Sequence, residues 1–198
     1  AGCATAPTGP EPAEVRTDLE AKPPEPVLVP TDEEVMYRVF AGEYLGSEGE
    51  LPQAVDHYLD AALVSNDPLI AQRATRIAFA ADAWQQAAMA ADRWAMLSPD
   101  SVPAQESAAT AMLRVGDFFG AEYPLSRILE ILDDSVDAWV LVSRVLSQSG
   151  EQGPADATLV QLQGQRPDAD PAIVFYARSQ LAATFRDLES AFEFARKS

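Results

Sequence analysis

The residue types that most often carry catalysis or hold metals are scarce in this chain. It has one cysteine, Cys3, and one histidine, His57. A catalytic nucleophile needs a base within hydrogen-bond reach, and His57 has no second histidine and no serine or cysteine in a recognisable nucleophile setting. A zinc site built from cysteine and histidine needs about four ligands. The sequence therefore predicts no catalytic set, no metal site and no cofactor, and it favours a protein that is not an enzyme.

The charge of the chain also narrows the classes of partner. Acidic residues number 31 against 14 basic ones, which gives a net charge of −17. Such a surface repels nucleic acid phosphates and anionic lipid headgroups, so we expect no nucleic acid partner and no membrane binding through bulk charge. A basic protein is the electrostatic complement, although solubility alone also explains the excess of acid. No run of residues approaches the roughly 18 apolar residues of a membrane span.

Residues 1–30 differ in composition from the rest. They hold seven of the fifteen prolines and no aromatic residue. Proline fixes φ and removes a donor, which favours extended, polyproline-like chain, and sparse apolar content leaves little to offset the ordering entropy. We expect residues 1–30 to be a disordered or semi-rigid tether and residues 31–198 to fold.

The tether begins with Ala1-Gly2-Cys3. This triplet resembles the end of a bacterial lipoprotein signal, in which cleavage precedes a cysteine whose thiol is then lipidated. The resemblance implies that Cys3 is a lipid anchor and that Ala4, in place of aspartate, directs the protein to the outer membrane. The hydrophobic core of such a signal does not precede the triplet here, and an incidental cysteine in a flexible tail is the alternative.

The folded part is organised by an alanine that recurs at a nearly constant spacing. Ala54, Ala87, Ala121 and Ala155 recur at intervals of about 34 residues, a spacing typical of helical repeat proteins. Five residues before each one stands a turn signal, which contains glycine in three cycles and Asp82 in the second. A fixed period of this size indicates stacked helical hairpins, since two helices approach closely only where one side chain is short.

Five cycles of two helices follow from this spacing. We expect them to begin near Asp32, Pro68, Pro103, Asp137 and Pro171. Pro124 falls inside the second helix of the third cycle and is expected to kink that helix or delay its start. The fifth cycle needs about two extra residues to bring Ala191 into the alanine position. Because its last helix has no polar cap, we expect the array to continue beyond Ser198 or the last helix to pair with another subunit.

These cycles resemble the tetratricopeptide repeat, a helix-turn-helix unit of about 34 residues. The residues that carry the resemblance best are Trp139, Gly150, Ala155 and Pro167 in the fourth cycle, and Gly42, Gly49, Ala54, Tyr58 and Ala61 in the first. The resemblance implies an all-α fold, a right-handed α-solenoid of about five antiparallel helix pairs. A non-repeating helical bundle is the alternative.

The same resemblance locates a candidate binding site. In tetratricopeptide arrays the first helices line a concave groove, which implies a partner-binding groove formed by Arg76, Phe79, Leu113, Arg114, Val140, Arg144 and Tyr176. Arginine makes two-pronged hydrogen bonds with carboxylates, so an extended peptide with a carboxylate would dock there. Alternatively, these arginines pair with neighbouring acids such as Glu106. The asparagines of the family's carboxylate clamp are absent.

A lipid tether followed by a tetratricopeptide array resembles periplasmic lipoproteins of Gram-negative bacteria. The layout implies a non-enzymatic scaffold on the periplasmic face of the outer membrane that binds a protein partner, and the partner we favour is a carboxyl-terminal-processing protease with its substrates. Lipoproteins that assemble pili or outer-membrane proteins have the same layout. A cytoplasmic co-chaperone or regulator without an anchor is a rival interpretation, and a docking module of a longer enzyme is a third.

Overall fold

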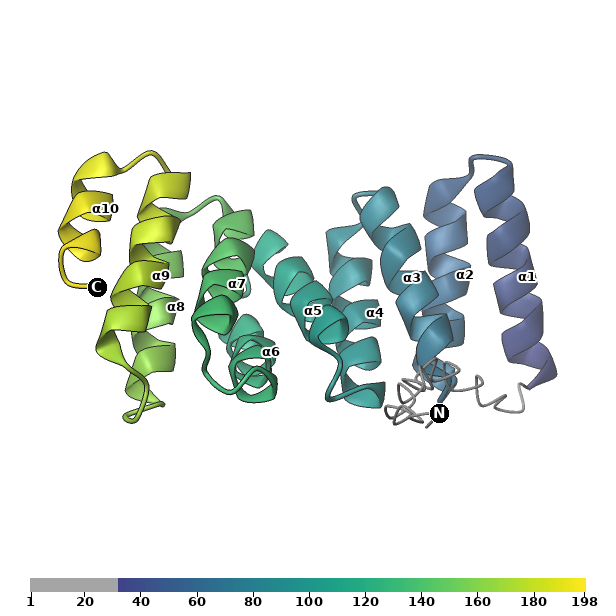
Figure 1. Cartoon of the computed structure of the whole chain (residues 1–198). Helices are drawn as coiled ribbons and strands as arrows, with labels where there is room; N and C mark the ends of the chain where they lie inside the picture. The colour runs from purple at the N-terminus through teal and green to yellow at the C-terminus, as the bar shows by residue number, and fades with distance from the viewer. Residues whose placement is uncertain (1–31) are drawn as a thin grey trace, which may run out of the picture.

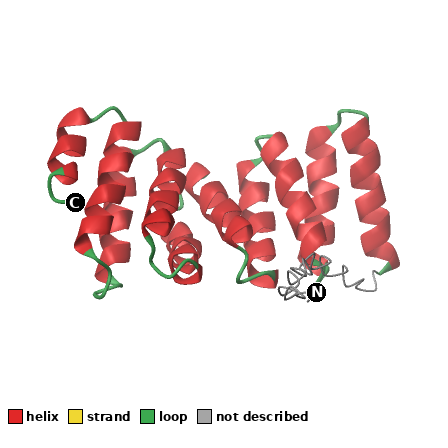
Figure 2. Ribbon diagram, in the orientation of Figure 1, coloured by secondary structure: helices red, strands yellow, loops and turns green. Residues whose placement is uncertain are grey.

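The computed structural model describes residues 32–198, and within them every regular element is a helix (Figures 1 and 2). The expected tether of residues 1–30 and its Cys3 lie outside the described residues. The elements are α1 (Glu33–Ser47), α2 (Leu51–Val64), α3 (Pro68–Ala80), α4 (Trp84–Leu97), α5 (Val102–Arg114), α6 (Phe118–Ile131), α7 (Val136–Leu146), the 3-10 turn η1 (Ser147–Ser149), α8 (Gln152–Gly164), α9 (Pro171–Thr184) and α10 (Leu188–Ala195).

The helices form five consecutive pairs that follow one another along one axis from α1 to α10 (Figure 1). From α1 to α6 each helix packs mainly against its neighbours in sequence, whereas α7 packs mainly against α9, the first helix of the next pair. The described part of the chain is therefore an α-solenoid of antiparallel helix pairs, as the repeat period predicts.

A left-handed residue ends the first helix of every pair. The positive φ angles are 84° at Gly49, 52° at Asp82, 79° at Gly116, 76° at Gly150 and 63° at Arg186. Asp82 thus takes the conformation that glycine takes in the neighbouring turns, which aspartate tolerates better than most side chains. The step from Gly150 to Arg186 is two residues longer than the step from Gly116 to Gly150, so the expected insertion in the fifth cycle is confirmed.

Four of these turns share one backbone hydrogen bond. The residue after the left-handed one donates its N–H to the carbonyl five residues earlier in the pairs Glu50–Leu45, Ala83–Ala78, Asp117–Met112 and Asp187–Ala182, at 2.9–3.0 Å. This bond defines the Schellman motif, which satisfies a carbonyl that the helix end leaves open. In the fourth pair η1 extends α7 instead.

The four periodic alanines lie where the period places them. Ala54, Ala87, Ala121 and Ala155 are all 0% exposed, each in the first half of the second helix of its pair. Ala191, their counterpart in α10, is only partly buried, and α10 contains no fully buried residue. The fully buried alanine therefore recurs in four pairs.

The size of the buried side chains changes along the solenoid. From α2 to α5 most buried apolar residues are alanines, whereas from α6 to α9 leucine, isoleucine, valine and Trp139 fill the interior. The backbones of α3 and α4 accordingly run close together, while those of α7 and α8 approach at few points. The repeat thus keeps its period while the distance between paired helices varies.

Pro124 lies buried inside α6, and the helix runs through it from Phe118 to Ile131. The expected delay of the helix start is wrong. Asp117 caps the helix by accepting a hydrogen bond from the Gly120 N–H at 2.7 Å, which fixes the start well before the proline.

A close contact joins the first two helices. A Cβ on Gly42 of α1 would lie 2.6 Å from Cδ2 of Tyr58 on α2, so the ring needs a glycine beneath it. The Tyr58 hydroxyl donates to Glu43, and Arg73 on α3 donates to the same carboxylate at 3.0 Å. Burial raises the pKa of Tyr58, while the hydrogen bond from Tyr58 lowers the pKa of Glu43.

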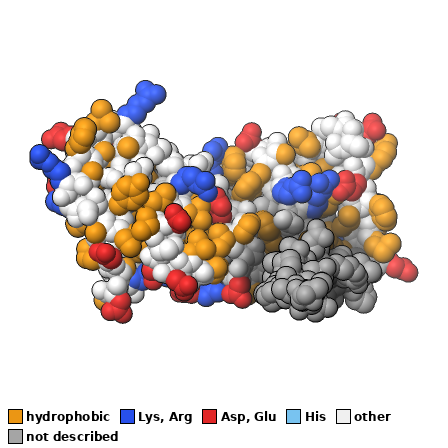
Figure 3. All heavy atoms as spheres, in the orientation of Figure 1, with side chains coloured by type: hydrophobic (Ala, Val, Ile, Leu, Met, Phe, Trp, Pro, Cys, Tyr) orange, Lys and Arg blue, Asp and Glu red, His pale blue; other side chains and the backbone are white. Residues whose placement is uncertain are grey.

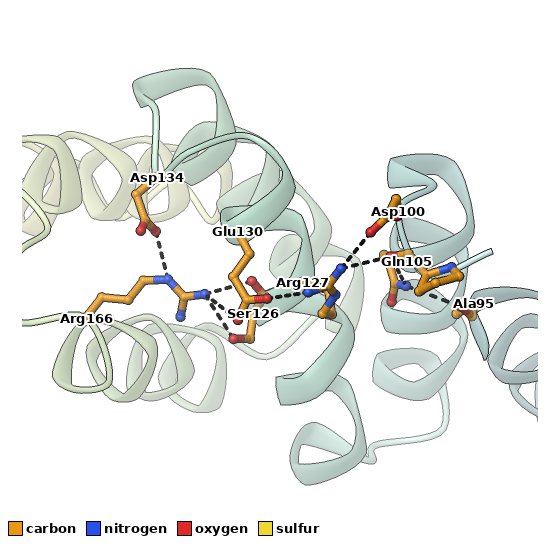
Figure 4. A network of polar contacts seen from close by, with 9 residues as sticks. Ala95, Asp100, Gln105, Ser126, Arg127, Glu130, Asp134 and Arg166 are labelled. Carbon is orange, nitrogen blue, oxygen red and sulfur yellow. Dashed lines mark hydrogen bonds and ion pairs between the residues drawn. The ribbon is translucent and has the colours of Figure 1, made fainter. Parts of the chain in front are cut away.

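Arginines on or just after the second helices bind the turns between repeats. Arg93 of α4 donates to the Ser65 carbonyl at 2.8 Å, and Arg127, at the same position one repeat later, donates to Asp100 at 2.9 Å. In Figure 4 Arg166 lies in one row with Arg127, with Glu130 between them. Arg166 reaches the Ser126 carbonyl at 2.8 Å and Asp134 at 2.7 Å. These contacts link each of the three pairs to the pair before it.

The buried alanine contact makes a testable prediction about stability. We expect Ala87→Leu to lower the free energy of unfolding by about 1–3 kcal/mol, because three extra carbons must enter a fully packed contact. Urea denaturation followed by circular dichroism measures the change. The matched control is Ala157→Leu on the exposed face of α8, which should stay within about 0.5 kcal/mol of the parent protein. Equal effects in the two variants would contradict the role of the alanine contact.

Candidate partner-binding groove

A hollow of about 340 Å³ lies between the first helices of three successive pairs. It is open to solvent, and its walls come from α3, α5, α7 and η1. The lining residues are Phe79, Pro103, Glu106, Ser107, Thr110, Arg144, Val145 and Gln148. The structure therefore places a concave site on the face where the sequence resemblance implies a groove, and we call it the first-helix groove.

Helix α5 supplies half of the lining. Pro103, Glu106, Ser107 and Thr110 follow the three-to-four spacing of one helix face, and the Ser101 side chain caps the helix just before them. Phe79 and Val145 add apolar surface from the flanking helices. Figure 3 shows hydrophobic side chains over α5 and α7 with acidic and basic side chains among them. The groove thus combines apolar contacts, hydroxyl groups and charge.

One ion pair crosses the groove. Arg144 Nη2 donates to Glu106 Oε1 at 3.1 Å, with side chains that are 65% and 36% exposed. The alternative that the arginines pair with neighbouring acids is confirmed for Arg144. An exposed pair of this kind contributes about 0–1 kcal/mol, so a carboxylate from a partner competes with Glu106 at little cost.

The remaining two arginines lie in different surroundings. The Arg114 guanidinium lies 4.1 Å from the ring centre of Trp84, and that ring packs against Phe79 at 5.4 Å. Arg114 is therefore held over an aromatic ring of α4 beside the groove. Arg76 is exposed on α3, one turn before Phe79, and makes no ion pair with another residue of the described range 32–198.

Three further predicted groove residues do not line the hollow. Leu113 is 2% exposed because it packs in the interior with residues of α6 and α7, so its assignment to a binding surface is wrong. Val140 is partly buried on α7, and Tyr176 is 41% exposed on α9. Of the predicted groove residues, only Phe79 and Arg144 meet in the hollow.

The sequence prediction selected arginines and apolar residues for the groove, so it missed the neutral polar lining residues. Thr110 lies one repeat after Arg76 and one repeat before Arg144, so the repeat period alone would have found it. Gln148 likewise lies one repeat after Arg114. Thr110 and Gln148 could therefore have been found by comparing equivalent positions in successive repeats, whatever their charge.

The described range contains neither a metal-binding cluster nor a membrane-spanning helix. Between residues 32 and 198 no group of three or more histidine, cysteine, aspartate or glutamate side chains is arranged to hold a metal ion. None of the helices from α1 to α10 combines the length and the apolar character needed to cross a membrane.

No protein-family model matches the chain. It is similar to a TPR repeat-containing protein of Pseudomonas aeruginosa, with 29% identity over 97 residues. That match covers 49% of this chain and 16% of the relative, so it spans less than a fifth of the relative's length.

Solved structures with similar folds include tetratricopeptide-repeat proteins and MamA proteins. A tetratricopeptide repeat protein from Parabacteroides merdae has a TM-score of 0.47 at 16% identity, covering 82% of this chain and 63% of its own. MamA from Desulfovibrio magneticus has a TM-score of 0.46 at 13% identity, and the match covers 85% of this chain and 94% of the MamA chain. YrrB, described as a TPR protein with an unusual peptide-binding site, has a TM-score of 0.45 at 18% identity. The match covers 82% of this chain and 84% of the YrrB chain.

The repeated pair geometry defines the fold class. The described part of the chain is an α-solenoid of helix pairs with an open groove on its first helices, and part of its sequence is similar to a TPR repeat-containing protein.

Proposed function

We propose that the protein is a non-enzymatic scaffold that binds an extended segment of a protein partner in the first-helix groove. The observation that carries the proposal is the hollow between α3, α5 and α7, which is lined by apolar, hydroxyl and charged side chains. A partner that lies along it buries Phe79 and Val145 and finds hydrogen-bond partners in Ser107, Thr110 and Gln148.

A carboxylate on the partner suits the basic side of this groove. Arg144 is held by a single hydrogen bond to an exposed glutamate, so its remaining N–H groups can donate to a ligand. Arg76 stands on α3, two repeats before Arg144 and at the equivalent repeat position. A carboxylate that reaches these arginines gains charge-assisted hydrogen bonds, which are roughly twice as strong as neutral ones.

This proposal predicts a charge-dependent loss of binding. We expect Arg76→Ala with Arg144→Ala to weaken binding of extended peptides with free carboxyl ends by more than about 1.5 kcal/mol, the lower range for hydrogen bonds to charged groups. Fluorescence anisotropy against an arrayed peptide library, with the same peptides amidated at the C-terminus, measures the loss. Arg114→Ala is the matched control, because the Arg114 guanidinium is already held over the Trp84 ring, whereas Arg76 is exposed and makes no ion pair within residues 32–198. Unchanged affinity in the double variant would show that the peptide binds another face of the protein.

For location, we propose a lipid tether at Cys3 that holds the solenoid on the periplasmic face of the outer membrane. Support comes from the Ala1-Gly2-Cys3 triplet and the proline-rich residues that follow it. Mass spectrometry of the protein isolated from its native cells tests the anchor: we expect an acylated N-terminal peptide beginning at Cys3. An unmodified cysteine within a longer N-terminal extension would favour a cytoplasmic peptide-binding regulator.

For the partner, we propose a carboxyl-terminal-processing protease and its substrates, with the scaffold acting as the adaptor. The support is the layout of tether plus helix-pair array. Purification of the tagged protein from periplasmic extract should recover such a protease together with cell-wall hydrolases. Recovery of pilus or outer-membrane assembly components in their place would assign the protein to that second function.

A further inference from the structure

A second hollow lies on the layer of second helices, away from the first-helix groove. It has a volume of about 370 Å³ and is lined by Phe119, Gly120, Glu122, Tyr123 and Ser126 of α6 together with Gln165, which follows α8. Phe119 is 84% exposed and Tyr123 is 68% exposed, one helical turn apart on the same face. Two solvent-exposed aromatic rings thus lie beside the carboxylate of Glu122.

The repeat architecture does not require aromatic residues at these positions. The equivalents of Phe119, one repeat before and one repeat after it, are Gln85 and Gly153, and those of Tyr123 are Met89 and Ala157. The neighbouring second helices therefore fold with polar, flexible or small side chains at the same places. The aromatic pair on α6 contributes surface rather than packing, which is typical of a contact site.

The charge around the hollow favours a cation. Glu122 is partly exposed in its wall and makes no ion pair with another residue between 32 and 198. The nearest arginines are occupied, because Arg127 binds Asp100 and Glu130 while Arg166 binds Ser126 and Asp134. The chain as a whole has a net charge of −17, so it attracts a basic ligand and repels an acidic one.

The chemistry of the pair also suits a guanidinium or ammonium group. Aromatic faces attract cations, and this chain already uses the contact internally: Arg114 lies 4.1 Å from the ring centre of Trp84, and Arg178 lies 4.1 Å from that of Phe194. Phe119, Tyr123 and Glu122 would offer the same contact to a side chain from outside, with the Gln165 amide oxygen as a further acceptor.

We propose that this hollow binds an arginine or lysine side chain of a basic segment on a protein partner. Phe119 and Tyr123 flank the cation, Glu122 neutralises it, and the acidic surface steers the segment to the site. The proposal is independent of the carboxylate-binding role of the first-helix groove, because it uses the layer of second helices and a ligand of opposite charge.

The test uses a short fluorescein-labelled peptide of alternating arginine and glycine at low ionic strength. We expect Phe119→Ala with Tyr123→Ala to weaken its binding by about fivefold or more, because two exposed cation–π contacts are lost. Glu122→Gln should weaken binding too. Backbone amide shifts induced by the peptide should gather in residues 119–126 and at Gln165.

Gln85→Ala with Met89→Ala is the matched control, since it removes the equivalent side chains from α4. The peptide should bind this control as it binds the parent protein. Equal weakening in the α4 control, or amide shifts spread over all acidic surfaces, would show that only bulk charge attracts the peptide and would overturn the proposal. Absence of any binding to the parent protein would overturn it as well. None of these outcomes alters the carboxylate test of the first-helix groove.

Discussion

The structure depends on the close approach of two antiparallel helices at a buried alanine. A larger side chain at Ala54, Ala87 or Ala121 would push the paired helices apart, because each position is fully enclosed and the paired backbones run close together there. Ala155 is equally enclosed, although α7 and α8 approach at few points. Each pair then presents the same two faces to the next pair, so the contact recurs and a linear array results. The groove on the first helices and the aromatic pair on α6 are consequences of this stacking, since both are formed by side chains that the alanine contact does not use.

The turns impose a second constraint, on the direction in which the chain returns after each first helix. A left-handed residue reverses the chain after each first helix, and glycine, aspartate and arginine all fill that position. The Schellman hydrogen bond then fixes how the second helix returns in four of the five pairs. Between successive pairs, arginines such as Arg93 and Arg127 bind the turns that join one pair to the next. The turns thus fix the geometry within a pair, and the arginine contacts limit rotation between successive pairs.

The sequence predicted the architecture well and the groove only in part, for physical reasons. Period and small residues depend on helix packing, which repeats locally, so the pairs, the alanines and the turn at Asp82 could be read from spacing. Which acid an arginine meets depends on side-chain reach across pairs, as Arg144 with Glu106 and Arg114 with Trp84 show. Leu113 lies one repeat after Phe79, yet Phe79 lines the hollow and Leu113 is buried, so equivalent repeat positions differ in exposure. The exposure of Phe119 matches that of its repeat equivalents Gln85 and Gly153, but its aromatic character has no counterpart in the neighbouring repeats.

The gradient in side-chain size along the interior has a consequence for mechanical behaviour. Burying an alanine methyl releases less free energy than burying leucine, isoleucine or tryptophan, so the helices from α2 to α5 are joined more weakly than those from α6 to α9. In a one-dimensional array each pair is supported only by its neighbours. Under tension we therefore expect α10, which has no fully buried residue, to detach first, and the alanine-rich pairs to unfold before the leucine-rich interior of α6 to α9.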